Sequence, residues 1–289
     1  MQAETIMVVG AGLMGRGIAE VAACSGCRVI WGDVKAELVQ QGLDEIRQSF
    51  ARRVEKKKIS KEEHDRLMGL LHANVIVAEN LHAAARADMV IEAITENLSH
   101  KRELHATLGK ICRPEAILVS NTSTLSITAL GASSGRPGKF IGMHFFSPVP
   151  VMKVVEVIRG LLTSDETCQA ALALTAKMGK EAVLAPDIPG FIVNRTILAW
   201  YGEAIDMVAS GVRPEDIDRG WRLATNAAMG PLETADFSGL HVVLHAMDSV
   251  YEATGDAKFK AHPLLRNMVQ AGMLGRKSGR GFYDYAKKK

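Results

Sequence analysis

Cysteine is scarce in this 289-residue sequence, which contains only Cys24, Cys27, Cys112 and Cys168. Four scattered thiols do not make a disulfide framework, so a reducing compartment is expected. Cys24 and Cys27 form a C-x-x-C pair, but we expect it where a helix ends and a strand begins, whereas redox pairs open a helix. We therefore interpret both thiols as small buried apolar groups. No second cysteine or histidine pair has ligand spacing, so no metal site is predicted.

The sequence also lacks an excess of either charge, a long apolar run and a leader. Its 35 Lys and Arg residues stand against 32 Asp and Glu residues, so nucleic acid is not expected to be the main partner. No apolar stretch approaches the roughly eighteen residues of a membrane span. The first residues, MQAETIMVVG, show no charged segment followed by an apolar core. These absences predict a cytoplasmic protein that binds neither nucleic acid nor membrane.

What the sequence does contain is an alternation of short β-branched runs and helical stretches from Thr5 to about Asp187. Strands separated by helices indicate βαβ units, so we predict an α/β fold with a doubly wound, mostly parallel sheet. The predicted strands are Ile6–Val9, Arg28–Trp31, Val75–Ala78, Met89–Ile94, Ile117–Ser120, Phe140–Phe145, Val154–Ile158 and Ala182–Ala185.

Two departures from this rhythm divide the chain. The charged, proline-free region of about residues 35–71 suits a helical-hairpin insertion, with its turn near Ser60 and a capping box formed by Ser60 and Glu63. Beyond Asp187 the strand pattern stops, and helices punctuated by glycine and proline follow. We predict a first domain at residues 1–187 and an all-α C-terminal domain at residues 188–289.

The stretch GAGLMG, from Gly10 to Gly15, matches the G-x-G-x-x-G pattern of dinucleotide-binding loops. A predicted strand precedes it, an apolar helix follows it, and a second strand ends shortly before an acidic residue, which favours this interpretation over a plain glycine turn. Gly10 permits the tight turn, Gly12 lets the backbone approach the pyrophosphate, and Gly15 lets the helix pack on the strand. We predict a Rossmann-type domain in which Gly10, Gly12, Leu13, Met14 and Gly15 bind the cofactor.

The acidic residue, Asp33, selects between the two nicotinamide cofactors. A carboxylate at this position accepts hydrogen bonds from the adenine ribose and repels a 2′-phosphate, which favours NAD over NADP. Lys35 lies two residues further on and could meet such a phosphate. NADP therefore stays the less favoured alternative.

Polar residues inside apolar strands mark a second site. Glu92 and His144 fall towards the carboxyl ends of predicted strands, where open α/β sheets bind ligands. His144 and Glu156 lie six residues either side of Pro150, so a hairpin about the prolines would oppose them on one face. A carboxylate on one ring nitrogen leaves the other nitrogen able to take a proton, as in a general base. The competing interpretation is a buried, satisfied His–Glu pair.

Several long stretches of the chain resemble the L-3-hydroxyacyl-CoA dehydrogenases, particularly the short-chain 3-hydroxybutyryl-CoA dehydrogenases. They are VVGAGLMGRGIAEVAA, VIEAITENLSHK, SNTSTLSIT, GMHFFSPVPVMKVVEVI, DIPGFIVNR, MGPLETADFSGL and LGRKSGRGFYDY. The resemblance covers nearly the whole chain. It implies reversible, NAD-dependent oxidation of an L-3-hydroxyacyl-CoA to a 3-ketoacyl-CoA, in a cleft between the two domains, and a place in fatty acid metabolism.

The resemblance also implies catalytic roles. His144 would take the proton of the 3-hydroxyl group, and Glu156 would orient its ring and stabilise the imidazolium. Ser123 and Asn194 would donate or accept hydrogen bonds at the reacting oxygen and the thioester. For Ser123 the competing interpretation is a helix N-cap, and for Asn194 it is a hydrogen bond at a helix end.

Binding roles follow from the same likeness. Glu92 and Lys101 match positions around the nicotinamide half of the cofactor, although a solvated helix position competes for Lys101. The run RRVEKKK, residues 52–58, carries five positive charges against one negative charge, which suits the phosphates of coenzyme A. Arg52, Lys56 and Lys58 are therefore expected to bind CoA, although such a run alone is usually solvated surface.

Two departures from the family pattern limit these inferences. Thr124 stands where a second serine is frequent, and Ala227–Ala228 where a proline is frequent. The second departure lies near the expected acyl pocket and subunit contacts, so the acyl chain length stays open. The family forms dimers through the C-terminal domain, which implies a homodimer here. The alternatives are a polyol-acid dehydrogenase of the L-gulonate type and a non-catalytic NAD-binding or structural protein.

Overall fold

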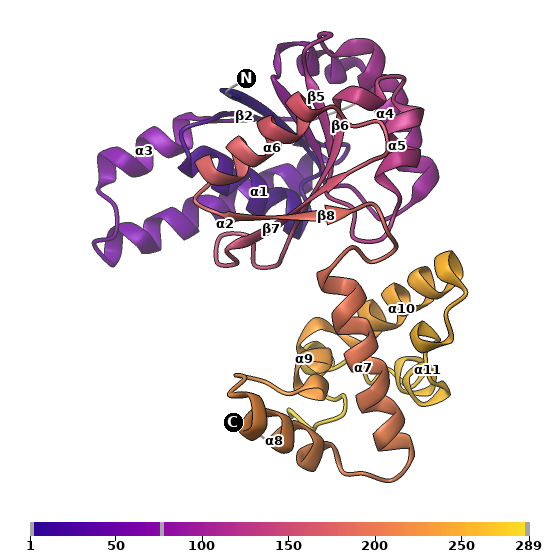
Figure 1. Ribbon diagram of the computed structural model, residues 1–289. Coiled ribbons are helices and arrows are strands. Elements are labelled where there is room, and N and C mark those ends of the chain that lie inside the picture. Colours follow the sequence, from indigo (N-terminus) through magenta and orange to yellow (C-terminus); the bar gives the residue numbers. More distant parts are fainter. Residues whose placement is uncertain (1–2, 76–77, 287–289) are drawn as a thin grey trace. The chain divides into compact units, whose positions relative to one another are not determined.

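The computed structural model describes residues 3–75 and 78–286 (Figure 1). The chain divides into one compact unit at residues 1–187 and a second at residues 188–289. No helix in the described ranges is long and apolar enough to cross a membrane.

An eight-stranded sheet forms the first unit, in the order β3-β2-β1-β4-β5-β6-β7-β8. All neighbours pair in parallel except β6 and β7, which are antiparallel. The predicted doubly wound, mostly parallel sheet is confirmed. Its strands are β1 (Thr5–Val9), β2 (Arg28–Asp33), β3 (Leu71–Val75), β4 (Met89–Glu92), β5 (Ile117–Ser120), β6 (Phe140–Phe145), β7 (Val154–Arg159) and β8 (Glu181–Pro186).

One predicted strand lies elsewhere. The pattern favoured Val75–Ala78, of which residues 76 and 77 lie outside the described residues, whereas β3 spans Leu71–Val75 and a 3-10 helix, η1 (Ala78–Arg86), begins at Ala78. In the parallel ladder, Leu71 is the partner of Val29 in β2, and Val75 is the partner of Asp33. This register is set by pairing with β2 and cannot be seen in the sequence of β3 alone. The predicted strand was therefore placed too far along the chain.

Helices cover both faces of the sheet because its strands are apolar on both sides. Helices α1 and α6 contact one face, and α4 and α5 contact the other (Figure 1). Cys24 closes α1 and the buried Cys27 immediately precedes β2; both are free thiols. The helices of this unit are α1 (Leu13–Cys24), α2 (Ala36–Glu55), α3 (Lys61–Gly69), α4 (Leu98–Ile111), α5 (Ile127–Ser133), α6 (Asp165–Lys177) and the 3-10 helix η2 (Pro137–Lys139).

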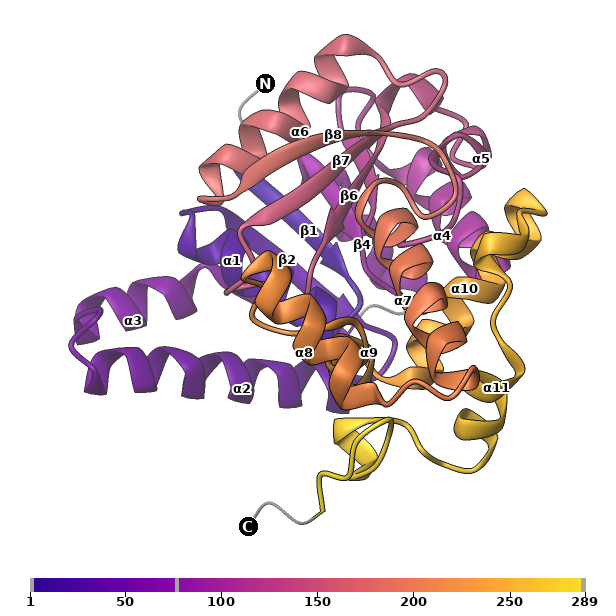
Figure 2. The same cartoon turned by 60° about the horizontal axis from the view of Figure 1, so that its bottom comes forward.

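Helices α2 and α3 form the predicted hairpin and project side by side from the sheet (Figure 2). The side chain of Ser60 accepts a hydrogen bond from the Glu63 amide at 3.1 Å, so Ser60 is the N-cap of α3. Ile46 and Phe50 of α2 are buried in the core of the first unit. The buried face of α2 therefore anchors the hairpin to the first unit, and the lysines at its turn, Lys56, Lys57 and Lys58, are exposed.

The second unit is all-α, as predicted. Its own core includes Leu198, Leu232, Met247 and Leu265. The helices are α7 (Val193–Ala209), α8 (Pro214–Thr225), α9 (Pro231–Ser238), α10 (Leu240–Thr254), α11 (Pro263–Gln270) and the 3-10 helices η3 (Ala257–Phe259) and η4 (Arg276–Ser278).

Candidate active site

The loop between β1 and α1 contains three glycines. At two of these positions a side chain would not fit, and at the third the backbone is exposed. A Cβ atom on Gly10, whose φ is +114°, would lie 2.4 Å from the Ala93 carbonyl oxygen. A Cβ on Gly15 would lie 1.9 Å from the Gly10 carbonyl oxygen. A Cβ on Gly12 would meet no atom within 4 Å, and Gly12 is exposed. Gly10 and Gly15 thus close the turn, and Gly12 leaves the backbone open to a ligand.

Two residues of β2 hold this loop in place. Oδ2 of Asp33 accepts a hydrogen bond from the Ala11 amide at 2.8 Å. The indole Nε1 of the fully buried Trp31 donates to the Gly10 carbonyl at 3.0 Å. The sequence did not indicate that Trp31 holds this loop, because its bond joins residues of two strands that only strand pairing brings together.

The loop fits the phosphates of a dinucleotide. The amides of the first turn of α1 have no helical partners, and that turn contains no acidic residue. Leu13 is 59% exposed at this turn, and Met14 packs partly against the core. Anionic phosphate groups are favoured at such a helix N-terminus.

His144 and Glu156 meet as the hairpin prediction required. They are direct partners in the antiparallel β6–β7 ladder, and Nδ1 of His144 lies 2.7 Å from Oε2 of Glu156. Glu156 is fully buried and His144 is 5% exposed. Since a carboxylate only accepts, Nδ1 carries the proton, and in the neutral form of the ring Nε2 is an acceptor.

Ser123 lies beside that second nitrogen. Its Oγ is 3.2 Å from Nε2 of His144, and in the neutral form of the ring with the proton on Nδ1 the hydroxyl is the donor. The N-cap of α5 is Ser126, whose side chain accepts from the Ala129 amide at 3.2 Å. The competing interpretation of Ser123 as that N-cap is therefore wrong.

Glu92 and Lys101 are both buried and bind each other. Lys101 Nζ lies 2.6 Å from Oε1 of Glu92, and His105 Nε2 and Ser120 Oγ lie 3.3 and 2.7 Å from Oε2. Burial raises the pKa of Glu92, but the hydrogen bond from His105 and the charge of Lys101 outweigh it and hold the pKa at about 2. The competing interpretation of Lys101 as a solvated helix position is wrong, and the cofactor roles of both residues stay predictions.

The loop between β6 and β7 lies against α1, which links the His–Glu hairpin to the dinucleotide loop. A Cβ on Gly17 of α1 would lie 2.7 Å from Cβ of Val149, so glycine permits this contact. Lys180, which is 9% exposed, donates to the carbonyls of Val149 and Met152 at 2.6 and 2.7 Å. Burial lowers the pKa of this lysine. The sequence suggested no role for Lys180, because its two partners are some thirty residues away.

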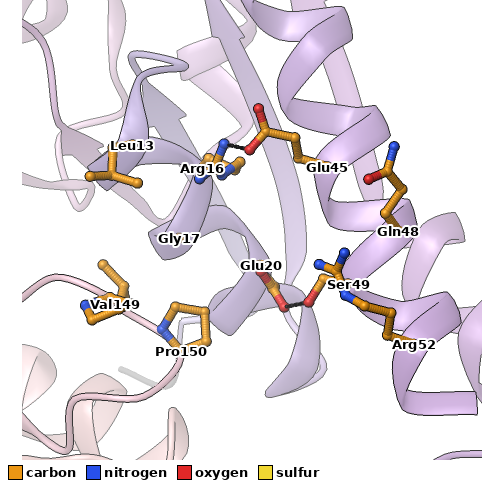
Figure 3. A pocket seen from close by; sticks show the side chains of 11 residues that line it. Leu13, Arg16, Gly17, Glu20, Glu45, Gln48, Ser49, Arg52, Val149 and Pro150 are labelled. Atoms are coloured by element: carbon orange, nitrogen blue, oxygen red, sulfur yellow. Dashed lines mark hydrogen bonds and ion pairs between the residues drawn. The ribbon is translucent and has the colours of Figure 1, made fainter. Parts of the chain in front are cut away.

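A groove of about 410 Å³ runs between α1, the hairpin helix α2 and the β6–β7 loop (Figure 3). Leu13, Val149 and Pro150 form its apolar side, and Arg52 lines it from α2. Arg16 of α1 is ion-paired with Glu45 of α2 within the groove. The groove thus has an apolar side and a polar side that carries two guanidinium groups, of Arg16 and Arg52, and two carboxylates, of Glu20 and Glu45.

The remaining predicted residues lie at two separate places. Lys58, together with Arg53, lines a neighbouring cavity of about 510 Å³, whereas Lys56 is exposed just beyond the end of α2. Asn194 is in the first turn of α7, in the second unit, and is half-buried.

A doubly wound sheet with a glycine loop opening onto a helix N-terminus defines a dinucleotide-binding domain of the Rossmann class. The model of the 3-hydroxyacyl-CoA dehydrogenase NAD binding domain matches residues 5–188, and that of the C-terminal domain of the same enzymes matches residues 190–285. The chain belongs to the 3-hydroxyacyl-CoA dehydrogenase family of oxidoreductases.

Individual relatives extend along the whole chain. The probable 3-hydroxybutyryl-CoA dehydrogenase of Bacillus subtilis (strain 168) is 48% identical over 289 residues, which cover 100% of this chain and 99% of the relative. The 3-hydroxyadipyl-CoA dehydrogenase of Escherichia coli (strain K12) is 40% identical over 98% of this chain and 59% of its own length. The crystal structure of (S)-3-hydroxybutyryl-CoA dehydrogenase from Ralstonia eutropha gives a TM-score of 0.94 at 39% identity, covering 99% of this chain and 100% of that one.

Proposed function

We propose that this protein interconverts an L-3-hydroxyacyl-CoA and the 3-ketoacyl-CoA, with NAD as cofactor and 3-hydroxybutyryl-CoA or a similar short acyl-CoA as substrate. The observation that carries the proposal is the 2.7 Å contact between Nδ1 of His144 and Glu156, two buried residues on paired strands. The other ring nitrogen of His144, Nε2, lies next to Ser123. Relatives whose names specify 3-hydroxybutyryl-CoA support the short acyl chain.

In this mechanism, His144 is the general base. Its Nε2 takes the proton of the 3-hydroxyl group, and in the reverse direction the imidazolium returns it to the ketone oxygen. Glu156 keeps the proton on Nδ1 and stabilises the imidazolium that forms. Ser123 holds the reacting oxygen by a hydrogen bond, and Asn194 binds the thioester end of the acyl group. When bound, NAD supplies the acceptor for the hydride that leaves the carbon bearing the 3-hydroxyl group.

The cofactor is NAD in preference to NADP. Gly10, Gly12 and Gly15, with Leu13 and Met14 at the start of α1, receive the pyrophosphate. Asp33 lies behind this loop, where its carboxylate accepts from the Ala11 amide and disfavours a 2′-phosphate nearby.

The coenzyme A part of the substrate lies along the hairpin. Arg52 of α2 lines the groove of Figure 3, and Lys58, three residues beyond the end of α2, lines the neighbouring cavity. Lys56 adds a charge at the end of that helix. Coulomb attraction and hydrogen bonds to the CoA phosphates would use all three side chains. A polyol acid has no phosphates that would need this path.

The active form is a homodimer made through the second unit, in the cytoplasm. Trp221, Leu223, Phe237 and Val242 of this unit are 40–76% exposed, which is costly for large apolar side chains in water. Light scattering on the purified protein measures the mass of the particle, and a monomeric mass at assay concentration contradicts the dimer.

The function is tested by following NADH absorbance with acetoacetyl-CoA and longer 3-ketoacyl-CoAs, for the wild type and His144→Gln. Turnover by the wild type and its loss in His144→Gln, with unchanged circular dichroism, are expected. If the folded wild type turns over no 3-ketoacyl-CoA with NADH or NADPH, the proposed function is wrong. Reduction of polyol-acid ketones in its place would support the L-gulonate-type alternative.

A further inference from the structure

The loop between β6 and β7 forms one side of the groove in Figure 3, and it continues directly from the strands that carry His144 and Glu156. Pro148 and Pro150 of this loop are exposed and line the groove. Val149, between them, is 3% exposed and packs on α1. The position of the loop therefore decides where the apolar side of the groove lies.

Hydrogen bonds within the loop leave two of its carbonyl groups to a distant partner. The amides of Val151 and Met152 both donate to the Pro148 carbonyl, at 2.9 and 3.0 Å, which closes a turn. The carbonyls of Val149 and Met152 accept instead from Lys180 Nζ, at 2.6 and 2.7 Å. Bonds from a charged donor are stronger than those between neutral groups, so one side chain holds the turn at two points.

Lys180 is itself held at a fixed point of the first unit. Helix α6 is followed by a turn at Gly179, whose φ is +67°, and the Lys180 amide donates back to the Thr175 carbonyl at 3.1 Å. Glu181 begins β8, and its amide donates to the Lys153 carbonyl at 2.8 Å. The junction between α6 and β8 therefore fixes the loop through one buried side chain.

We propose that Lys180 is a positioning residue for the acyl-CoA substrate: it holds the β6–β7 loop so that Pro148 and Pro150 form an apolar wall for the pantetheine chain. This inference rests on the proposed function, in which coenzyme A lies along the hairpin. Pantetheine is the uncharged part of coenzyme A, between the phosphates and the thioester, so an apolar wall suits it. Lys180 thus acts on substrate affinity through the loop.

The substitution Lys180→Met removes the ammonium group and keeps an unbranched side chain. If about two methylene groups of pantetheine lose their contact, KM should rise roughly tenfold. The rise should be equal for acetoacetyl-CoA and for acetoacetyl-pantetheine, which lacks the adenosine phosphates, with kcat and KM for NADH changed less than about twofold. Lys180→Arg, which keeps charged donors, should recover part of the affinity. Lys110→Met, at an exposed lysine in the last turn of α4, is the matched control.

A double-mutant cycle with Pro150 tests whether Lys180 acts through the wall. Pro150 is exposed, so Pro150→Gly removes a ring from the groove without opening the core. In this background, Lys180→Met should raise KM for acetoacetyl-pantetheine much less than in the wild type, because part of the wall is already gone. Equal increases in both backgrounds would contradict this action.

A different substrate dependence would also overturn the inference. Lys180 and Lys58 line the same cavity, so the ammonium group of Lys180 could attract phosphates directly. In that case Lys180→Met would raise KM for acetoacetyl-CoA and leave KM for acetoacetyl-pantetheine unchanged.

A measurement without turnover separates this inference from the proposed function. Hydrogen exchange at residues 149–153 reports on the loop, because the Val151 and Met152 amides are bonded within it. Exchange there should be faster in Lys180→Met than in the wild type and in Lys110→Met. Unchanged exchange in folded Lys180→Met protein would show that Lys180 does not hold the loop, whatever the substrate.

The combined results distinguish the two proposals. If the loop exchanges faster in Lys180→Met but both thioesters keep their wild-type KM, the positioning role is wrong and the proposed function stands. A folded wild type that turns over no 3-ketoacyl-CoA would refute the proposed function, and the positioning of its substrate with it.

Discussion

The Glu156→Gln substitution changes a charge in the proposed catalytic pair while keeping its shape. Glu156 is fully buried, His144 is 5% exposed, and their contact is 2.7 Å long. A hydrogen bond to a charged group at such a site contributes about 1.5–3 kcal/mol. Since the imidazolium exists only when His144 holds the transferred proton, most of this energy acts on the transition state. A loss of about 3 kcal/mol corresponds to a fall in kcat of roughly 150-fold.

The assay is NADH oxidation with acetoacetyl-CoA under saturating conditions, together with thermal unfolding to verify the fold. KM for acetoacetyl-CoA should change little, because the neutral ring binds before proton transfer. Glu181→Gln, at an exposed glutamate on the neighbouring strand β8, is the matched control. A kcat for folded Glu156→Gln within about threefold of the wild type would refute the role of the carboxylate and leave the pair as a structural contact.

Further predictions concern the substrate, the cofactor and stability. Alanine at both Lys56 and Lys58 should raise KM about tenfold for acetoacetyl-CoA but not for its N-acetylcysteamine thioester, which lacks phosphates; equal changes would contradict a phosphate contact. Asp33→Ala should lower the ratio of kcat/KM with NADH to that with NADPH, and an unchanged ratio would show that another residue selects the cofactor. Glu92 has a pKa of about 2, below its ordinary 4.5, so its ionised form stabilises the fold above pH 4.5 and this contribution, about 3 kcal/mol, is lost as the pH falls towards 2. Urea unfolding of the wild type and Glu92→Gln should therefore differ at neutral pH and converge in acid; a constant difference would contradict this linkage.

Local patterns predicted most of the fold. The glycine loop, the N-cap at Ser60 and the apolar strands each depend on residues close together in sequence, and the structure has them where expected. Of the predicted capping box only the Ser60 half is present, because the Glu63 carboxylate binds Arg66. The position of β3 was wrong, because its register is fixed by β2 and not by its own residues.

In the site, too, the contacts between residues close in sequence could be predicted, and those between distant residues could not. The pairing of His144 with Glu156 could be predicted because both lie in one hairpin with prolines between them. Lys180 and Trp31 could not be assigned, since the partners of Lys180 belong to a loop some thirty residues earlier and Trp31 bonds a loop from another strand. The sequence left open whether Lys101 is solvated or buried, for the same reason. Its burial depends on how α4 packs in the fold.

The sequence by itself determined the doubly wound sheet, the dinucleotide loop and the opposed His–Glu pair, because local sterics, hydrophobic periodicity and turn chemistry act within short segments. The tertiary structure decided which hydroxyl lies against His144 Nε2 and that Lys101 is buried in contact with Glu92 and Glu96. Those contacts join strands and loops that only the packed sheet brings together, and their energies depend on the burial that packing creates.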